Sequence, residues 1–123
     1  MKLLTKEILN RLPKLYSGED IPLEDKVVQV KFFNPVGAGT WYGVEYDPKT
    51  KIFFGYVSIF GDYNDEWGDF SLTELENYRG KFGLGIERDM SFTPEKFKDT
   101  KLGKDLKWQQ KNHTKETQKE NIF

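Results

Sequence analysis

Residues 40–70 have the sequence TWYGVEYDPKTKIFFGYVSIFGDYNDEWGDF, and this stretch decides the fold. Its segments 41–46 and 52–60 are rich in aromatic and β-branched side chains, which suit the packed faces of a sheet. Asp47 and Pro48 stand between them. Proline presets φ for the second position of a type I turn, and the aspartate carboxylate accepts from a backbone N–H two residues on. The pattern predicts a β-hairpin.

Alternation along the hairpin predicts which side chains share a face. In the first arm, Tyr42, Val44 and Tyr46 would lie on one side of the sheet. The second arm, residues 52–60, is apolar on both faces, and a strand that needs cover on both sides is typically internal to its sheet. Aromatic stripes of this kind most often belong to a core.

Two short helices are predicted to pack on this sheet. Thr5 is typical of an N-cap residue and would begin a helix over 5–12. Ser71 and the glutamate three residues later form a capping-box pattern for a helix over 72–79, with Gly80 as its left-handed C-terminal residue.

Runs of strands with few helices favour an α+β fold over alternating βαβ units. We expect one domain over residues 1–99: a small curved, mainly antiparallel sheet of four to six strands with the two short helices packed on it. Residues 100–123 are rich in Lys, Gln, Asn and Thr, which predicts a flexible tail.

Composition excludes several kinds of site. The 123 residues contain no cysteine and one histidine, His113. Disulfides, thiolate metal sites, cysteine nucleophiles and two-histidine metal sites are therefore excluded, and no catalytic constellation stands out. We expect no metal and no cofactor. No stretch is long enough for a signal sequence or a membrane span, so we expect a cytoplasmic protein with no membrane partner.

Charge is distributed unevenly along the chain. Residues 1–93 carry eleven Lys and Arg against fifteen Asp and Glu, a balance of −4, whereas residues 94–123 carry eight against five, a balance of +3. The acidic body argues against general nucleic-acid binding, which needs a basic surface. Only the tail could bind nucleic acid.

An acidic segment follows the hairpin, with Asp62, Asp65 and Glu66 next to Trp67. The spacing does not fit an EF-hand, because the position that needs glycine holds Trp67. A large apolar side chain on an acidic loop suggests a contact residue for a basic partner, such as a nucleic-acid-handling enzyme. The alternative is that Trp67 docks back onto the sheet.

Five other residues are candidates for a ligand site: Tyr42, Glu45, Tyr46, Tyr56 and Arg88. Tyrosines beside an arginine fork favour flat, polar ligands, so a nucleotide-like molecule is a second hypothesis. In the alternative, the tyrosines belong to the core and Arg88 pairs with Glu45 or with a backbone carbonyl.

Several ordered motifs carry a family resemblance. They are MKLLTKEIL (1–9), RLPKLYS (11–17), IPLEDKVVQVKFF (21–33), TWYGVEYDPKTKIFFGYV (40–57), EWGDFSLTELE (66–76) and GLGIERDMSFTP (83–94). Over about residues 1–99 the chain resembles a bacterial family of unknown function, domain of unknown function 2958. The chain departs from the family pattern in the longer loop 61–65 and in the lysine-rich tail.

The resemblance brings no biochemical activity with it, but it implies a context. Members are similar in being small proteins of plasmids, conjugative elements and phages, often near antirestriction genes. We therefore expect a non-enzymatic binding protein that inhibits a host defence system by occupying a protein partner, of the anti-restriction or anti-CRISPR type. One alternative is a protein that binds a nucleotide-like small molecule, or a small enzyme, with a pocket lined by tyrosines and arginine. The other is nucleic-acid binding through the tail.

Overall fold

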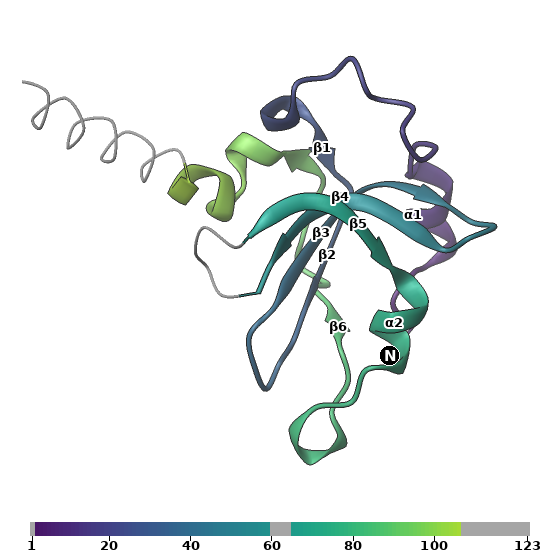
Figure 1. Ribbon diagram of the computed structural model, residues 1–123, viewed down its shortest axis with the longest axis vertical. Helices are drawn as coiled ribbons and strands as arrows, with labels where there is room; N and C mark the ends of the chain where they lie inside the picture. Colours follow the sequence, from purple (N-terminus) through teal and green to yellow (C-terminus); the bar gives the residue numbers. More distant parts are fainter. Residues whose placement is uncertain (1, 60–64, 107–123) are drawn as a thin grey trace, which may run out of the picture.

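A computed structural model describes residues 2–59 and 65–106, and its centre is an antiparallel sheet of five strands in the order β5-β4-β3-β2-β6 (Figure 1). These strands are β2 (Val30–Phe33), β3 (Thr40–Asp47), β4 (Ile52–Ser58), β5 (Glu66–Ser71) and β6 (Glu87–Arg88). A second, two-stranded sheet pairs β1 (Val27–Val28) with β7 (Glu95–Lys96). The labelled helices are α1 (Lys6–Arg11) and α2 (Leu72–Asn77), with 3-10 turns η1 (Leu23–Asp25), η2 (Lys81–Gly83) and η3 (Phe97–Asp99), and residues 101–106 are also helical. The predicted α+β fold is confirmed.

The predicted hairpin is β3 and β4. The Asp47 carboxylate accepts from Lys49 N at 3.1 Å and from Thr50 Oγ1 at 2.9 Å. The turn closes where Lys51, at φ 58°, donates its backbone N–H to the Asp47 carbonyl at 2.8 Å. As predicted, β4 is internal to the sheet, between β3 and β5.

A β-bulge in β3 changes which side chains share a face. The pairing runs from Gly43 opposite Gly55 directly to Glu45 opposite Phe54, so Val44 is an extra residue on β3. An extra residue reverses the alternation beyond it.

The prediction that Tyr42 and Tyr46 share a face is therefore wrong. Tyr42 lies opposite Tyr56 and belongs to one hydrophobic cluster, whereas Tyr46 lies opposite Phe53 and belongs to another. Simple alternation missed this because it assumes a period of two along the whole strand.

Each face of the sheet has its own core. The first core contains Leu3, Leu4, Ile8, Val30, Phe32, Tyr46, Phe53, Leu72, Leu75 and Ile86, so α1 and α2 cover that face. The second contains Val28, Tyr42, Val44, Tyr56 and Phe97, with Trp67, Phe92, Leu102 and Leu106 packed against it. Figure 1 shows the yellow-green segment 97–106 on the side of the sheet away from α1 and α2.

The helix starts are as predicted, but one helix end is not. The Thr5 Oγ1 accepts from Ile8 N, and the Ser71 Oγ accepts from Glu74 N, each at 3.2 Å. However, α2 ends at Asn77, and Gly80 has φ −97°, so it is not a left-handed cap.

The folded part of the chain continues past the predicted boundary at residue 99. Thr100 is 1% exposed; its hydroxyl donates to the Phe97 carbonyl at 2.6 Å and accepts from Gly103 N at 3.0 Å. Residues 101–106 are helical and pack on the second core. The rest of the predicted tail, residues 107–123, lies outside the described residues.

The close contact between β3 and β4 makes Gly55 irreplaceable. A Cβ on Gly55 would lie 1.7 Å from the Tyr42 carbonyl oxygen, whereas a Cβ on its cross-strand partner Gly68 would meet nothing within 4 Å. We expect Gly55→Ala to lower the free energy of unfolding in urea by about 3 kcal/mol or more, because backbone must move. Gly68→Ala should change it by less than about 1 kcal/mol. Equal effects of the two substitutions would contradict this packing.

Candidate binding surfaces

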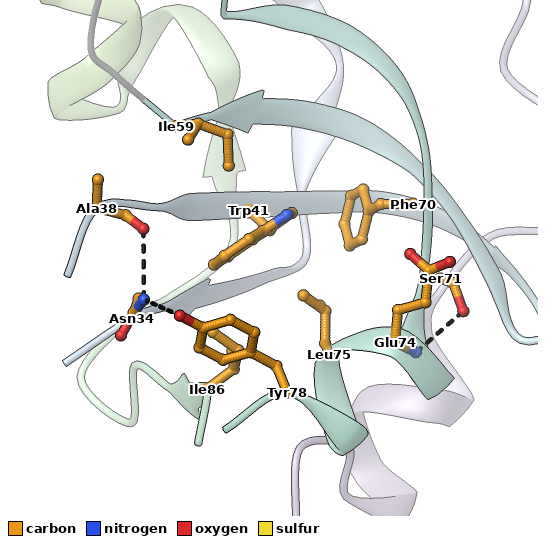
Figure 2. Close-up of a pocket in the computed structure, with 10 residues that line it drawn as sticks. All are labelled: Asn34, Ala38, Trp41, Ile59, Phe70, Ser71, Glu74, Leu75, Tyr78 and Ile86. Atoms are coloured by element: carbon orange, nitrogen blue, oxygen red, sulfur yellow. Dashed lines mark hydrogen bonds between the residues drawn. The ribbon is translucent and has the colours of Figure 1, made fainter. Parts of the chain in front are cut away.

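A pocket of about 360 Å³ opens on the first face of the sheet, and we call it the Trp41 pocket (Figure 2). Its aromatic walls come from three elements: Trp41 on β3, Phe70 on β5, and Tyr78 just after α2. Ile59, Leu75 and Ile86 supply aliphatic surface. Tyr78 is 44% exposed, so solvent reaches the pocket past its ring.

The polar groups of the Trp41 pocket lie on different sides of it (Figure 2). The Asn34 Nδ2 donates to the Ala38 carbonyl at 3.5 Å and to the Tyr78 hydroxyl at 3.4 Å, so its N–H groups have partners. Ser71 and Glu74 come from the start of α2. Glu74 is the one charged residue among those that line the pocket, and none of them is basic.

No residue of the Trp41 pocket was among the site residues predicted from the sequence. One local signal was present: Leu75 and Tyr78 are three positions apart in the predicted helix 72–79, the spacing of neighbours on one helix face. The other walls come from distant parts of the chain and meet only through the sheet pairing.

A second feature is the turn between α2 and β6, residues 79–85, which we call the Phe82 turn. It projects from the body at the end of the molecule opposite the loop that precedes η1 (Figure 1). Phe82 is 91% exposed and has φ 62° and ψ 17°, a left-handed conformation that costs a non-glycine residue free energy. Gly80 N donates to the Leu84 carbonyl at 2.7 Å, which closes the turn. Phe82 was not among the contact residues predicted from the sequence.

Glu45, a predicted ligand residue, has a structural role. It is 3% exposed, and its carboxylate accepts from Tyr16 N at 2.8 Å and from Gly18 N at 3.0 Å. Lys26 Nζ lies 3.7 Å from Glu45 Oε2 and donates to the Gly18 carbonyl at 2.6 Å. This buried cluster fastens the loop after α1 to the sheet.

Arg88, also a predicted ligand residue, ties the N-terminus to β6. Its Nη1 donates to the carbonyl oxygens of Lys2 at 2.6 Å and Leu3 at 3.0 Å. Of the two alternatives for Arg88, pairing with a backbone carbonyl is therefore what the structure shows.

The three predicted tyrosines are buried and do not form one site. Tyr42, Tyr46 and Tyr56 are each at most 5% exposed, and burial raises the pKa of all three hydroxyls above the ordinary value. They stay protonated at neutral pH and do not act as bases there. Tyr46 lies on the face opposite the other two, so no pocket joins Tyr42, Tyr46 and Arg88.

Trp67 lies on the edge strand β5 and not in a loop, and its ring docks onto the sheet. It is half-buried, with its ring centroid 4.7 Å from that of Phe97, 5.5 Å from Tyr56 and 5.8 Å from Phe54. Docking, the alternative in the sequence analysis, is what the structure shows.

The acidic residues around Trp67 differ in their surroundings. Asp65 accepts from Ser58 Oγ at 2.7 Å and from Ile59 N at 2.9 Å, so it fastens the end of β4. Glu66 is exposed, and Asp62 lies outside the described residues.

Two further properties follow from the described part of the chain. No three His, Cys, Asp or Glu side chains within residues 2–59 and 65–106 are grouped so that they could hold a metal ion. None of the helices described there has the length and apolar character to cross a membrane.

Comparison with known families places most of this chain in one family model. The model described as Protein of unknown function (DUF2958) matches residues 3–101, which confirms the resemblance. Neither the curated proteins nor the solved structures contain a match.

The buried Glu45–Lys26 pair generates a stability prediction. We expect Glu45→Gln to lower the free energy of unfolding by about 2–4 kcal/mol, because it leaves Lys26 buried without its carboxylate. Asp89→Asn is the matched control, since Asp89 pairs with Lys31 at 3.5 Å where both side chains are 29% exposed. The control should change the free energy by less than about 1 kcal/mol. Denaturant unfolding of both variants is the measurement, and equal losses would contradict a special role for Glu45.

Proposed function

Because the chain belongs to the DUF2958 family, we propose that it is a non-enzymatic binding protein of a phage or mobile genetic element. In this proposal it occupies the surface of a host protein and thereby inhibits a host defence system, of the anti-restriction or anti-CRISPR type. The mobile-element context is what the family resemblance implies, and the structure adds a surface suited to protein binding.

The observation that carries the proposal is the exposed, strained Phe82. A phenylalanine that is 91% exposed buries almost no apolar surface on folding, and its left-handed backbone lowers the stability of the fold. Strain of this kind persists where the surrounding structure enforces it, and it is concentrated at functional positions. Buried in a partner, the ring would supply the large, rigid apolar contact that is typical of interface hot spots.

The hydrogen bonds of the Phe82 turn support the same conclusion. Leu84 N donates to the Lys81 carbonyl at 3.2 Å, in addition to the bond from Gly80. A turn that is already formed loses little conformational entropy on binding. Tyr78 and Leu84, at 44% and 46% exposed, extend the apolar surface on either side of the tip.

Charge suggests the character of the partner site. Arg79 is exposed, and its Nη1 donates to the carbonyls of Glu76 and Tyr78, so the guanidinium is held beside the turn. With Lys81 it places two positive charges next to Phe82. A hydrophobic pocket with an acidic rim on the partner would complement this surface.

The edge of β5 is a second candidate contact within the same function. Glu66 and Asp69 are exposed there, and a basic nucleic-acid-handling enzyme would complement them. The nucleotide-like ligand has weaker support, because its predicted residues lie on opposite faces of the sheet. The proposal of nucleic-acid binding through the tail concerns residues 100–123, of which 107–123 lie outside the described part.

Capture from a lysate tests the proposal. The full-length chain serves as bait in a lysate of a bacterium with restriction and CRISPR systems, and retained proteins are identified by mass spectrometry. Phe82→Gly should reduce capture of the partner at least about tenfold, which corresponds to about 1.4 kcal/mol. The free energy of unfolding should stay unchanged or rise by up to about 1 kcal/mol, because glycine relieves the left-handed strain.

Ile21→Ala is the matched control. Ile21 is an exposed apolar residue, 47% accessible, on the loop before η1 at the far end of the molecule. The Ile21→Ala variant should capture the partner as well as the natural chain does. Full capture by Phe82→Gly would mean that the contact lies on another surface. If the natural chain retained no protein, that result would argue against a binding function.

A further inference from the structure

The Trp41 pocket combines aromatic faces with a single negative charge. Trp41, Phe70 and Tyr78 present rings from three separate elements around a space of about 360 Å³. The faces of aromatic rings carry negative electrostatic potential, which attracts cations, and tryptophan is the strongest of the three residue types in this respect. Glu74 adds a full negative charge, and no lining residue is basic.

The hydrogen-bonding groups of the pocket point to a ligand that donates. The Asn34 N–H groups are already directed to the Ala38 carbonyl and the Tyr78 hydroxyl. The Glu74 carboxylate has only acceptor atoms when it is ionised. A ligand with several N–H donors and a positive charge therefore complements the pocket, whereas a phosphate or carboxylate would meet like charge.

We propose that the Trp41 pocket binds the guanidinium group of an arginine side chain in another polypeptide. Guanidinium is planar and weakly hydrated, so it stacks on aromatic rings, and its donor fork pairs with a carboxylate through two parallel hydrogen bonds. In the bound state it lies against the Trp41 and Tyr78 rings and donates to Glu74.

A peptide-linked arginine suits this site better than the free amino acid. Free arginine carries an α-carboxylate, and no lining residue has a positive charge to pair with it. The blocked backbone of a polypeptide has no such charge. This inference does not depend on the Phe82 turn. The two surfaces share only Tyr78, and the pocket is defined by its own residues and by one chemical group.

Titration of the full-length chain with small probes, followed by ¹H–¹⁵N NMR, tests the site. The probes are N-acetyl-arginine methylamide, its uncharged isostere N-acetyl-citrulline methylamide, free arginine, and adenosine monophosphate. The arginine methylamide should shift the indole N–H signal of Trp41 and bind about tenfold more tightly than the citrulline probe. Free arginine should bind more weakly than the methylamide.

Two variants and a control assign the contacts. Glu74→Gln keeps a residue accepted at this position of a helix start, and Tyr78→Leu keeps apolar bulk on a half-exposed position. Each should weaken the arginine probe about fivefold while melting as the natural chain does. Glu76→Gln, which removes an exposed charge from the same helix outside the pocket, should leave the affinity unchanged.

Four results would overturn the proposal. They are equal binding of the citrulline probe, no effect of Glu74→Gln, tighter binding of adenosine monophosphate than of the arginine probe, and equal binding of free arginine. Because the readout is a defined probe at a defined indole, its failure is distinct from a failure to capture a partner from lysate.

Discussion

The extra residue in β3 is the constraint on which the rest of the molecule depends. Beyond Val44, every side chain of the strand is on the opposite face from where plain alternation would put it. The reversal delivers Tyr46 to the core under α1 and α2, and it delivers the Glu45 carboxylate to the backbone N–H groups of Tyr16 and Gly18. Without the bulge, the Glu45 carboxylate would face the hydrophobic first core, away from the backbone N–H groups that it binds in the structure.

Local features of the fold could be predicted from the sequence because they depend on neighbouring residues. The Asp47 turn and the N-caps Thr5 and Ser71 involve groups within four positions of one another, and all three are present. The bulge could not be predicted, because it is a register shift in the pairing of β3 with β4, which local residue patterns do not specify. Trp67 was assigned to a loop for a similar reason. Its acidic neighbours suggest exposure, and only the pairing of β5 with β4 brings its ring onto Phe97.

The candidate sites were less accessible to sequence reasoning than the fold. The predicted ligand residues were chosen as polar groups among aromatics. In the structure, Glu45 and Arg88 are already paired within the fold: Glu45 binds backbone and lysine, and Arg88 binds backbone carbonyls. The Trp41 pocket is assembled by tertiary packing of segments far apart in sequence. The exposure of the Phe82 ring depends on which way its turn projects from the body, and local residue patterns do not determine that.

Different segments of the chain complete the two cores, so the two faces of the sheet are covered at different times during synthesis. The first face is complete once residues up to Ile86 are present, since Leu3 and Leu4 come from the start and Ile86 from β6. The second face is complete only after Phe92, Phe97, Leu102 and Leu106 have also been synthesised. A nascent chain emerges N-terminus first, so it passes through a stage with one finished face and one bare face carrying Tyr42 and Tyr56. A chain truncated near residue 90 would remain at that stage. One face of its sheet would be uncovered, and the exposed aromatic side chains there would favour self-association.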